Sequence, residues 1–153
     1  MPDPIPVAHP NPDTSRAKIV AAALEAATAS KGRAYKFGGR TTAGFDCSGF
    51  VSYVYQLVFP DFAYVGTEQL RSGGLFSEVT TPSAGDLIFF PEGENPFEVA
   101  KNNKRDFPNH VGIVLDAHTW IGSQSSTGVA RVPMTSAWWK GRAAVYLRYK
   151  NLK

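Results

Sequence analysis

Residues 14 to 30 repeat apolar side chains every three or four positions, which is the spacing of one face of an α-helix. Thr14 or Ser15 can cap the start of this helix, because a side-chain oxygen accepts a hydrogen bond from the unpaired N–H groups of the first turn. The stretch is rich in alanine and ends near Gly32. Its apolar positions are Ile19, Val20, Ala23, Leu24 and Ala27.

A second helix is predicted from Asp46 onward, after a loop over residues 35–44 that contains three glycines. Pro60 should end this helix, since proline has no N–H to continue the hydrogen-bond ladder. The apolar stripe consists of Cys47, Phe50, Val51, Val54, Leu57 and Val58.

The second half of the chain has the pattern of β-strands. Short runs of branched and aromatic residues are separated by turn residues. The segment before them, residues 61–85, reads mostly as loop with one helical turn at 66–71. Helices followed by an antiparallel sheet indicate an α+β domain. The predicted strands are 86–90, 110–115, 119–124, 129–134 and 143–149.

Residues 1–13 contain five prolines and no periodic apolar pattern, so we interpret them as an extended leader. They lack the basic start and apolar core of a secretory signal. Residues 14–153 are expected to form a single domain. Within it, residues 91–108 are a polar insert between two predicted strands, either a loop on the substrate side or a solvated excursion.

Composition narrows the possible classes of protein. Of 153 residues, 43% are hydrophobic and 19% are charged, a globular balance that excludes wholesale disorder and coiled coil. A single cysteine excludes an intrachain disulfide and a cysteine-rich zinc site. No apolar run approaches the roughly 20 residues of a membrane helix. The net charge of +3 permits an anionic partner without arguing for one.

The lone cysteine, Cys47, is predicted to lie in the first turn of the second helix, directly after its capping residue Asp46. Unpaired amide groups and the positive end of the helix dipole stabilise a thiolate there. This placement suits a nucleophile. The alternative is that Cys47 is a small buried apolar residue, as free cysteines commonly are.

A nucleophilic thiol needs a base, usually an imidazole. The chain has three histidines. His9 lies in the proline-rich leader, and His118 lies in a predicted hairpin turn, where it should face solvent. His110 begins a buried strand, and Gly112 beside it would leave space for a neighbouring helix end. His110 is therefore the candidate base, although it could also be a core residue with satisfied hydrogen bonds.

Four short sequence blocks occur in a fixed order along the chain. They are Tyr35-x-x-Gly38-Gly39, Phe45-Asp46-Cys47-Ser48-Gly49-Phe50, Pro82-x-x-Gly85-Asp86-Leu87-Ile88-Phe89-Phe90 and His110-Val111-Gly112-Ile113. In this order and at these spacings they resemble the NlpC-type family of papain-like cysteine peptidases, which are bacterial cell-wall endopeptidases. The resemblance covers residues 34–115. It implies a circularly rearranged papain-like fold, with helices packed on an antiparallel sheet.

The resemblance also implies an activity: cleavage of peptidoglycan stem peptides, most often between γ-D-glutamate and a diamino acid, without metal or organic cofactor. Cys47 would be the nucleophile and His110 the general base. The Cys47 amide and the Tyr35 hydroxyl would lie near the oxyanion, and Asp46 and Ser48 would line the subsite for the free amino terminus. Tyr35 could instead only pack, Asp46 only cap the helix, and Ser48 only be small. Asp86 is expected to tether a turn.

The chain departs from the family at the third catalytic position. That residue, often a second histidine, normally follows the first by twelve positions, which gives Gly122 here. Side chains alternate faces along a strand, so Gln124 should share a face with His110 and Ser123 should not. We therefore expect the Gln124 amide oxygen to hold the imidazole. The alternative is that this Ser/Thr/Gly-rich stretch is a turn with no catalytic role.

Three functions follow from these residues. The first is a peptidoglycan endopeptidase. The second is a muramoyl-alanine amidase or acyltransferase with the same Cys and His, and the third is a wall-binding module without turnover. We expect a monomer with no nucleic-acid partner that acts in the bacterial wall or periplasm. Delivery by a secretion system or phage particle, an immunity partner, and action on imported fragments in the cytoplasm stay open.

Overall fold

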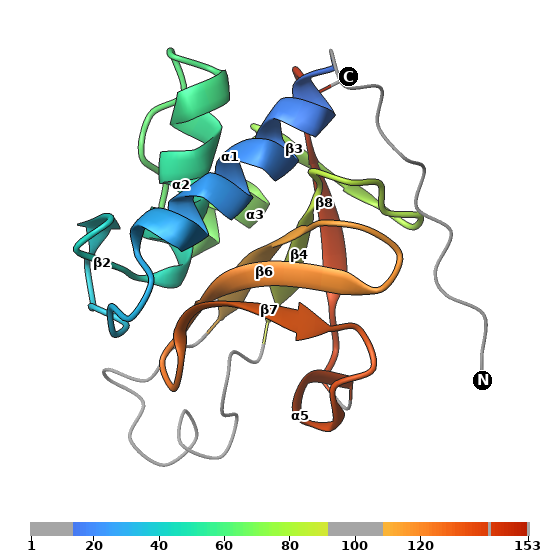
Figure 1. Ribbon diagram of the computed structural model, residues 1–153. Helices are drawn as coiled ribbons and strands as arrows, with labels where there is room; N and C mark the ends of the chain where they lie inside the picture. Colours follow the sequence, from blue (N-terminus) through green and yellow to red (C-terminus); the bar gives the residue numbers. More distant parts are fainter. Residues whose placement is uncertain (1–13, 92–108, 141, 153) are drawn as a thin grey trace.

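The computed structural model describes residues 14–91, 109–140 and 142–152. The long helices come first along the chain and most strands follow, which is the order of an α+β domain. The two long helices lie on one side of the sheet, and a short helix near the end of the chain lies on the other side (Figure 1). The helices are α1 (Ser15–Ala29), α2 (Cys47–Val58), α3 (Thr67–Ser72) and α5 (Ala137–Lys140). The strands are β1 (Arg40–Thr41), β2 (Gly44–Phe45), β3 (Phe76–Val79), β4 (Leu87–Phe90), β5 (His110–Val114), β6 (Thr119–Gln124), β7 (Gly128–Pro133) and β8 (Val145–Tyr149).

Strands β3 to β8 form one sheet in the order β3-β8-β4-β5-β6-β7, and each neighbouring pair is antiparallel. Strands β5, β6 and β7 follow one another as hairpins. The last strand, β8, returns to lie between β3 and β4. Strands β1 and β2 form a separate two-residue hairpin directly before α2. The register pairs Phe90 of β4 with His110 of β5 at one end of the sheet.

The two faces of the sheet carry separate hydrophobic clusters. Val111 and Ile113 of β5 belong to the larger cluster, which includes α1 and α2 residues such as Ile19 and Phe50. Val114 of β5 belongs to a smaller cluster on the other face. Burial of apolar surface at roughly 25 cal/mol per Å² stabilises both layers. The members of the smaller cluster are Ile88, Phe90, Val114, Trp120, Val132 and Trp139.

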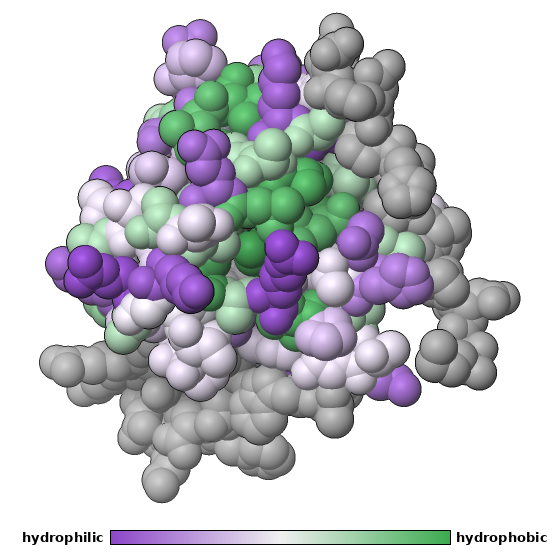
Figure 2. All heavy atoms as spheres, viewed as in Figure 1, coloured by the Kyte–Doolittle hydropathy of each residue, from purple (hydrophilic) through white to green (hydrophobic). Residues whose placement is uncertain are grey.

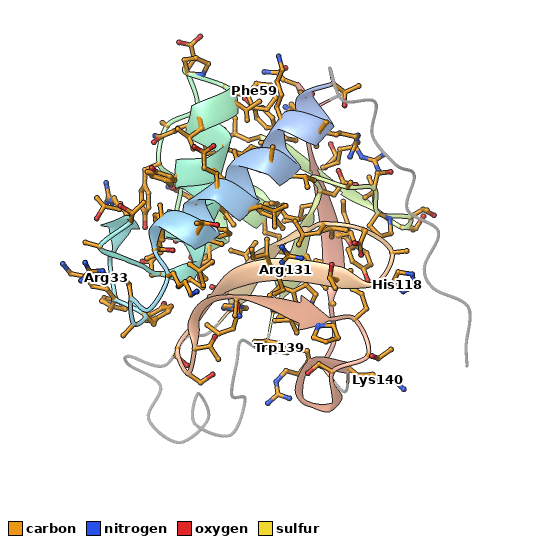
Figure 3. The ribbon with its side chains drawn as sticks, in the orientation of Figure 1. Arg33, Phe59, His118, Arg131, Trp139 and Lys140 are labelled. Atoms are coloured by element: carbon orange, nitrogen blue, oxygen red, sulfur yellow. The ribbon has the colours of Figure 1, made fainter. Side chains whose placement is uncertain are left out.

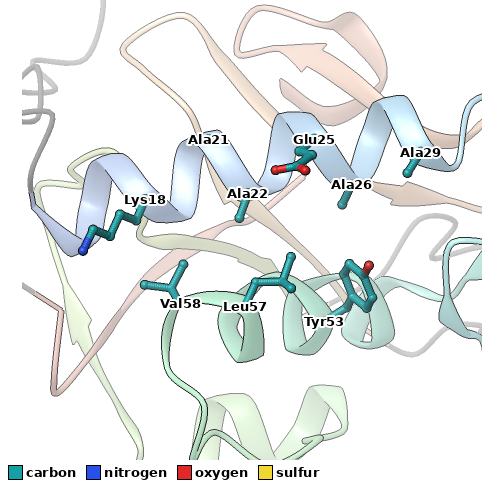
Figure 4. A pocket seen from close by; sticks show the side chains of 9 residues that line it. All are labelled: Lys18, Ala21, Ala22, Glu25, Ala26, Ala29, Tyr53, Leu57 and Val58. Atoms are coloured by element: carbon teal, nitrogen blue, oxygen red, sulfur yellow. The ribbon is translucent and has the colours of Figure 1, made fainter.

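Helices α1 and α2 pack against each other and leave a groove of about 540 Å³ between them (Figure 4). Alanines of α1, among them Ala22 and Ala26, line one wall of the groove. Leu57 of α2 lines the other wall and is 55% exposed. Leu57 therefore differs from its predicted place in the buried stripe, because the short alanine side chains do not reach it. Figure 2 shows hydrophobic surface over this region.

Asp86 ties three elements together. Its carboxylate is fully buried and pairs with Arg16 of α1 at 3.0 Å and with Arg148 of β8 at 2.8 Å. It also accepts a hydrogen bond from the N–H of Ser83 at 2.7 Å, which is the turn tether expected from the sequence. The hydroxyl of Tyr55 donates to the carbonyl of the neighbouring Gly85, and burial raises the pKa of Tyr55.

The α+β prediction is confirmed, and so are both long helices and the helical turn that became α3. The five predicted strands correspond to β4 to β8, with ends shifted by two residues or fewer. Strand β3, the β1–β2 hairpin and α5 were not predicted. Residues 1–13, including His9, and residues 92–108 lie outside the described residues. In the remaining chain, no helix is long and apolar enough to span a bilayer.

Candidate active site

Asp46 caps the N-terminus of α2, so that Cys47 becomes the first helical residue. One carboxylate oxygen of Asp46 accepts from the N–H of Gly49 and from the Ser48 hydroxyl, the latter at 3.3 Å. The other oxygen accepts from the N–H of Gly38 at 3.0 Å. The cap therefore joins the preceding loop to the helix and orders the residues on both sides of Cys47.

Glycines allow the loop to approach the helix closely. Gly38 adopts a φ of 75°, a left-handed conformation that other residues rarely take. The carbonyl oxygen of Gly39 accepts from the N–H of Asp46 at 3.0 Å. A Cβ atom on Gly49 would overlap that same carbonyl oxygen. The Gly-Gly pair and Gly49 thus fix the backbone of residues 38–40 against the first turn of α2.

His110 begins β5 and is fully buried. Its Nε2 lies 3.2 Å from Oε1 of Gln124, while the Gln124 Nε2 donates to the carbonyl of Ala130 at 3.4 Å. With the amide in this orientation, Oε1 accepts from the imidazole N–H, which places the proton on Nε2. The other nitrogen, Nδ1, then carries a lone pair. It has no hydrogen-bond partner among the described residues.

Strand register brings His110 and Gln124 onto one face. Ile113 pairs with Ile121, and Val114 pairs with Trp120, so continuing the register places His110 opposite Gln124. A Cβ atom on Gly122 would lie 2.8 Å from the Gln124 Oε1. Gly122 therefore leaves room for the Gln124 side chain to reach the imidazole.

Ser123 and Gly112 lie close to Gln124 and His110 in the sequence, and the prediction holds for the first of them only. Ser123 faces away from His110, as its parity predicts, and donates to the carbonyl of Phe45 at 2.7 Å. The space beside Gly112 was expected to hold a helix end, and this is wrong. A Cβ atom there would overlap the ring of Trp120, so an aromatic side chain fills that space.

Aromatic rings surround the imidazole of His110. Trp139 of α5 stacks on it, with ring centroids 5.0 Å apart and planes 22° apart. Trp120 and Phe90 lie at 5.9 and 6.2 Å. Figure 3 marks Trp139 beneath the sheet, next to the exposed Lys140. Burial lowers the pKa of His110 to about 4, partly offset by the hydrogen bond with Gln124, so the ring is neutral at pH 7.

The element that carries Cys47 and the strand that carries His110 are packed neighbours. Helix α2 contacts β5 and β6, and the Ser123–Phe45 hydrogen bond joins β6 to the residue two places before Cys47. Nδ1 of His110 makes no hydrogen bond to the Cys47 sulfur, and Cys47 is 5% exposed. The rings around His110 belong to the smaller cluster, on the face of the sheet opposite to α2, whereas Cys47 belongs to the larger cluster. The pairing of this nucleophile with this base therefore rests on the resemblance of the sequence blocks and not on a contact in the structure.

Sequence analysis missed two residues beside Ser48. The hydroxyls of Ser48 and Tyr64 lie 3.3 Å apart, and the Arg40 guanidinium lies over the Tyr64 ring, 3.6 Å from its centroid. Tyr64 comes from a segment read only as loop, so only the three-dimensional contact reveals it. Tyr35 is half-buried in the loop before β1.

The remaining titratable candidates lie elsewhere. His118 is exposed in the turn between β5 and β6, as expected, at the end of this hairpin opposite to His110 and Gln124 (Figure 3). The backbone N–H groups of His118 and Thr119 donate to the Asp116 carboxylate, which helps to lower the pKa of Asp116. Within the described ranges, no cluster of three His, Cys, Asp or Glu residues could hold a metal ion.

The chain is similar to known proteins of one family. Residues 32–148 match the model of the NlpC/P60 family. The chain is 31% identical over 76% of its length to the probable peptidoglycan endopeptidase LytE of Bacillus subtilis, and covers 30% of that protein. It is 31% identical over 73% of its length to the murein DD-endopeptidase/LD-carboxypeptidase MepS of Escherichia coli K12, covering 53% of it. A gamma-DL-glutamyl hydrolase of Bacillus subtilis is 29% identical over 77% of the chain, which spans 26% of that protein.

A solved structure of the same type also matches. The NlpC/p60 domain of the peptidoglycan hydrolase SagA superposes with a TM-score of 0.58 at 29% identity, covering 85% of this chain and 96% of that domain. The chain thus spans nearly all of that solved domain, but about half or less of the length of the three curated relatives.

Proposed function

Since the chain belongs to the NlpC/P60 family, we propose that it is a cysteine peptidase that hydrolyses an amide bond in peptidoglycan stem peptides. The family match over residues 32–148, a range that includes Cys47 and His110, carries the proposal. His110 is fully buried, its Nε2 is held by Gln124, and its Nδ1 keeps an unpaired lone pair. A buried polar atom without a partner is costly, and accepting a proton from a thiol gives this atom a role.

The proposed reaction starts at Cys47. Nδ1 of His110 takes the thiol proton, and the sulfur attacks the scissile carbonyl carbon to form a tetrahedral intermediate. The protonated imidazole then gives its proton to the leaving amine, which breaks the C–N bond and leaves a thioester. Nδ1 then takes a proton from a water molecule, whose oxygen attacks the thioester carbonyl carbon. The C–S bond breaks, the acid product leaves, and the imidazolium returns its proton to the Cys47 sulfur. Gln124 keeps the proton on Nε2 throughout, so that Nδ1 stays the active nitrogen.

The neighbouring residues are proposed to bind the substrate. The backbone N–H of Cys47 and the Tyr35 hydroxyl would stabilise the oxyanion, and each such donor is commonly worth about 3 kcal/mol. Asp46 and Ser48 would receive the free amino terminus of the stem peptide. A carboxylate has roughly four lone-pair positions. Asp46 already accepts from Gly49, Gly38 and Ser48, so capacity for one ammonium donor remains.

We propose that the scissile bond joins γ-D-glutamate to a diamino acid. The name of the gamma-DL-glutamyl hydrolase supports this choice. The name of the MepS relative instead specifies a DD-endopeptidase and LD-carboxypeptidase activity, so the names of the relatives point to more than one scissile bond. Action in the bacterial wall or periplasm, and the monomeric state, remain predictions.

Hydrolysis of a defined stem tetrapeptide under reducing conditions tests the proposal, with products identified by mass spectrometry. We expect release of the dipeptide that ends in γ-D-glutamate, with loss of turnover in Cys47→Ala and His110→Ala. His118→Ala is the matched control, because His118 is exposed in a distant turn, and it should keep the parent rate. Turnover by Cys47→Ala at the parent rate would contradict the nucleophile assignment.

The same digests separate the alternatives. An amidase would free whole stem peptides from the sugar of isolated wall material, and an acyltransferase would attach an added amine. An unchanged tetrapeptide at all pH values, together with a thiol of ordinary reactivity near a pKa of ~8.5, would indicate a binding module without turnover.

A further inference from the structure

We propose that Arg40 binds a carboxylate of the substrate on the acyl side of the scissile bond. This inference rests on the proposed function and adds a specificity determinant to it. A γ-linked glutamyl residue carries its α-carboxylate as a free group, whereas an amidated stem carries a neutral carboxamide there. Arg40 would therefore select stems in which this carboxylate is not amidated.

The backbone places Arg40 beside the nucleophile. Arg40 pairs with Phe45 across the β1–β2 hairpin, two residues before Cys47. The preceding residue, Gly39, accepts from the N–H of Asp46, and its carbonyl lies against Gly49 in the first turn of α2. Arg40 is thus attached to the same rigid junction that caps the helix, and its position follows that of Cys47.

The side chain of Arg40 is oriented before any ligand binds. Its guanidinium lies 3.6 Å above the centroid of the Tyr64 ring, and the Tyr64 hydroxyl contacts the Ser48 hydroxyl. Stacking of this kind holds the guanidinium plane while its N–H donors stay available at the edge. Arg40 is exposed, and no carboxylate of the described chain pairs with it.

The negative charge of Asp46 and the positive charge of Arg40 match the amino terminus and the α-carboxylate of a glutamyl dipeptide. Asp46 and Ser48 supply the acceptors proposed for the amino terminus, and Ser48 contacts Tyr64, which supports Arg40. An anion-binding and a cation-binding group therefore lie on one continuous chain of contacts next to Cys47. A guanidinium prefers carboxylates because its parallel N–H donors match both oxygens.

The test compares two synthetic stem peptides that differ only at this α-carbon, one with a carboxylate and one with a carboxamide. The parent protein should show a kcat/KM about tenfold higher for the carboxylate peptide, a size typical of a charge-assisted bond at a partly solvated site. Arg40→Gln should lower kcat/KM for the carboxylate peptide to the level of the carboxamide peptide. It should leave the carboxamide peptide unchanged.

Further variants distinguish a specific contact of Arg40 from an effect of any positive charge in the same loop. Lys36→Gln removes a positive charge from the same loop, and Lys36 has no contact with Tyr64 among the described interactions, so the preference should persist. Tyr64→Phe keeps the ring under the guanidinium and should keep the preference, whereas Tyr64→Leu should weaken it. If Arg40→Gln retained the full preference for the carboxylate, the assignment of Arg40 would be wrong.

Binding to Cys47→Ala, measured by calorimetry, separates this inference from the proposed function. If the parent cleaves both peptides but shows no preference, Arg40 is not a determinant while the peptidase proposal stands. If the parent cleaves neither peptide, the peptidase proposal fails. In that case, the binding data still test Arg40. Tighter binding of the carboxylate peptide by Cys47→Ala that is lost in Cys47→Ala/Arg40→Gln would support the inference that Arg40 binds the carboxylate. Equal binding of both peptides by Cys47→Ala would overturn that inference.

Discussion

The imidazole of His110 is held from three directions by side chains of different chemistry. Gln124 accepts at Nε2, Trp139 stacks on one face of the ring, and Trp120 meets its edge. Nothing acidic contacts the ring within the described part of the chain. The imidazole is therefore neutral at pH 7. In the proposed mechanism, proton transfer from Cys47 would accompany the attack on the substrate.

Activity should persist to unusually low pH. Because the pKa of His110 is lowered to about 4, the imidazole keeps its lone pair until the pH falls to that value. The acid limb of kcat/KM should thus lie near pH 4, well below the 6.5 of a free histidine. Gln124→Glu places a carboxylate beside Nε2 and should move the limb up by at least about one pH unit. A limb near 6.5 in the parent protein would contradict a buried neutral base.

The same pKa makes folding stability depend on pH. The unfolded chain binds a proton at His110 near pH 6.5, whereas the folded protein binds it only near pH 4. The stabilisation is therefore fully present above about pH 6.5 and is lost as the pH falls toward 4, by roughly 3 kcal/mol in all. Denaturant titrations across this range measure it. His110→Gln should flatten the dependence, and the exposed control His118→Gln should preserve it.

The face of the sheet on which each side chain lies could be predicted from the sequence, because side chains alternate between the two faces along a strand. Gln124 and His110 share a face in the structure, and Ser123 lies on the other, as strand alternation requires. The positions of Tyr64 and Trp139 could not be predicted, since each meets its partner across elements that are distant in the chain.

At the scale of elements, helix α2 depends on a close approach between two backbones. Gly49→Ala forces a methyl group into the Gly39 carbonyl oxygen, and neither backbone can move without breaking the Asp46 cap. We expect unfolding to become easier by at least about 2 kcal/mol. Gly66→Ala is the control, since a Cβ atom there meets nothing within 4 Å. It should cost no more than about 1 kcal/mol. Thermal melts of both variants decide the comparison.

Long elements with strong caps were predicted well, and short ones were not. Helices α1 and α2 have capping residues and several apolar turns, which define their bounds in the sequence. Strand β3 has four residues, and only Phe76 is buried, so its pattern is too short to separate from a loop. Hairpin β1–β2 consists of two residues per strand and is stabilised by its contact with α2.

At the scale of the whole molecule, Asp86 connects the helical layer to the centre of the sheet. Its two arginine partners come from α1 and from β8, which lie at opposite ends of the described chain. The sequence predicted only the local turn, because pairing over such distances leaves no local pattern. The position of β8 between β3 and β4 escaped prediction for the same reason.

Removing this connection should destabilise the fold without touching the site. Asp86→Ala leaves Arg16 and Arg148 facing each other without a counter-charge, and breaking a buried ion pair in this way costs about 3 to 5 kcal/mol. The exposed control Asp61→Ala should change the free energy of unfolding by less than about 1 kcal/mol. Chemical denaturation compares the two. A loss for Asp86→Ala no larger than that of the control would show that the carboxylate is dispensable.

The hairpin of β5 and β6 contains both His110 and Gln124, only fourteen positions apart. The proposed proton acceptor and the amide that holds it therefore lie in one contiguous piece of chain. The sulfur arrives from a different layer of the molecule. Replacing that sulfur with a hydroxyl, as in Cys47→Ser, would leave the lowered pKa of His110 and its hydrogen bond to Gln124 unchanged. In the proposed mechanism, the base and the nucleophile therefore come from two separately folded parts of the chain, the β5–β6 hairpin and helix α2.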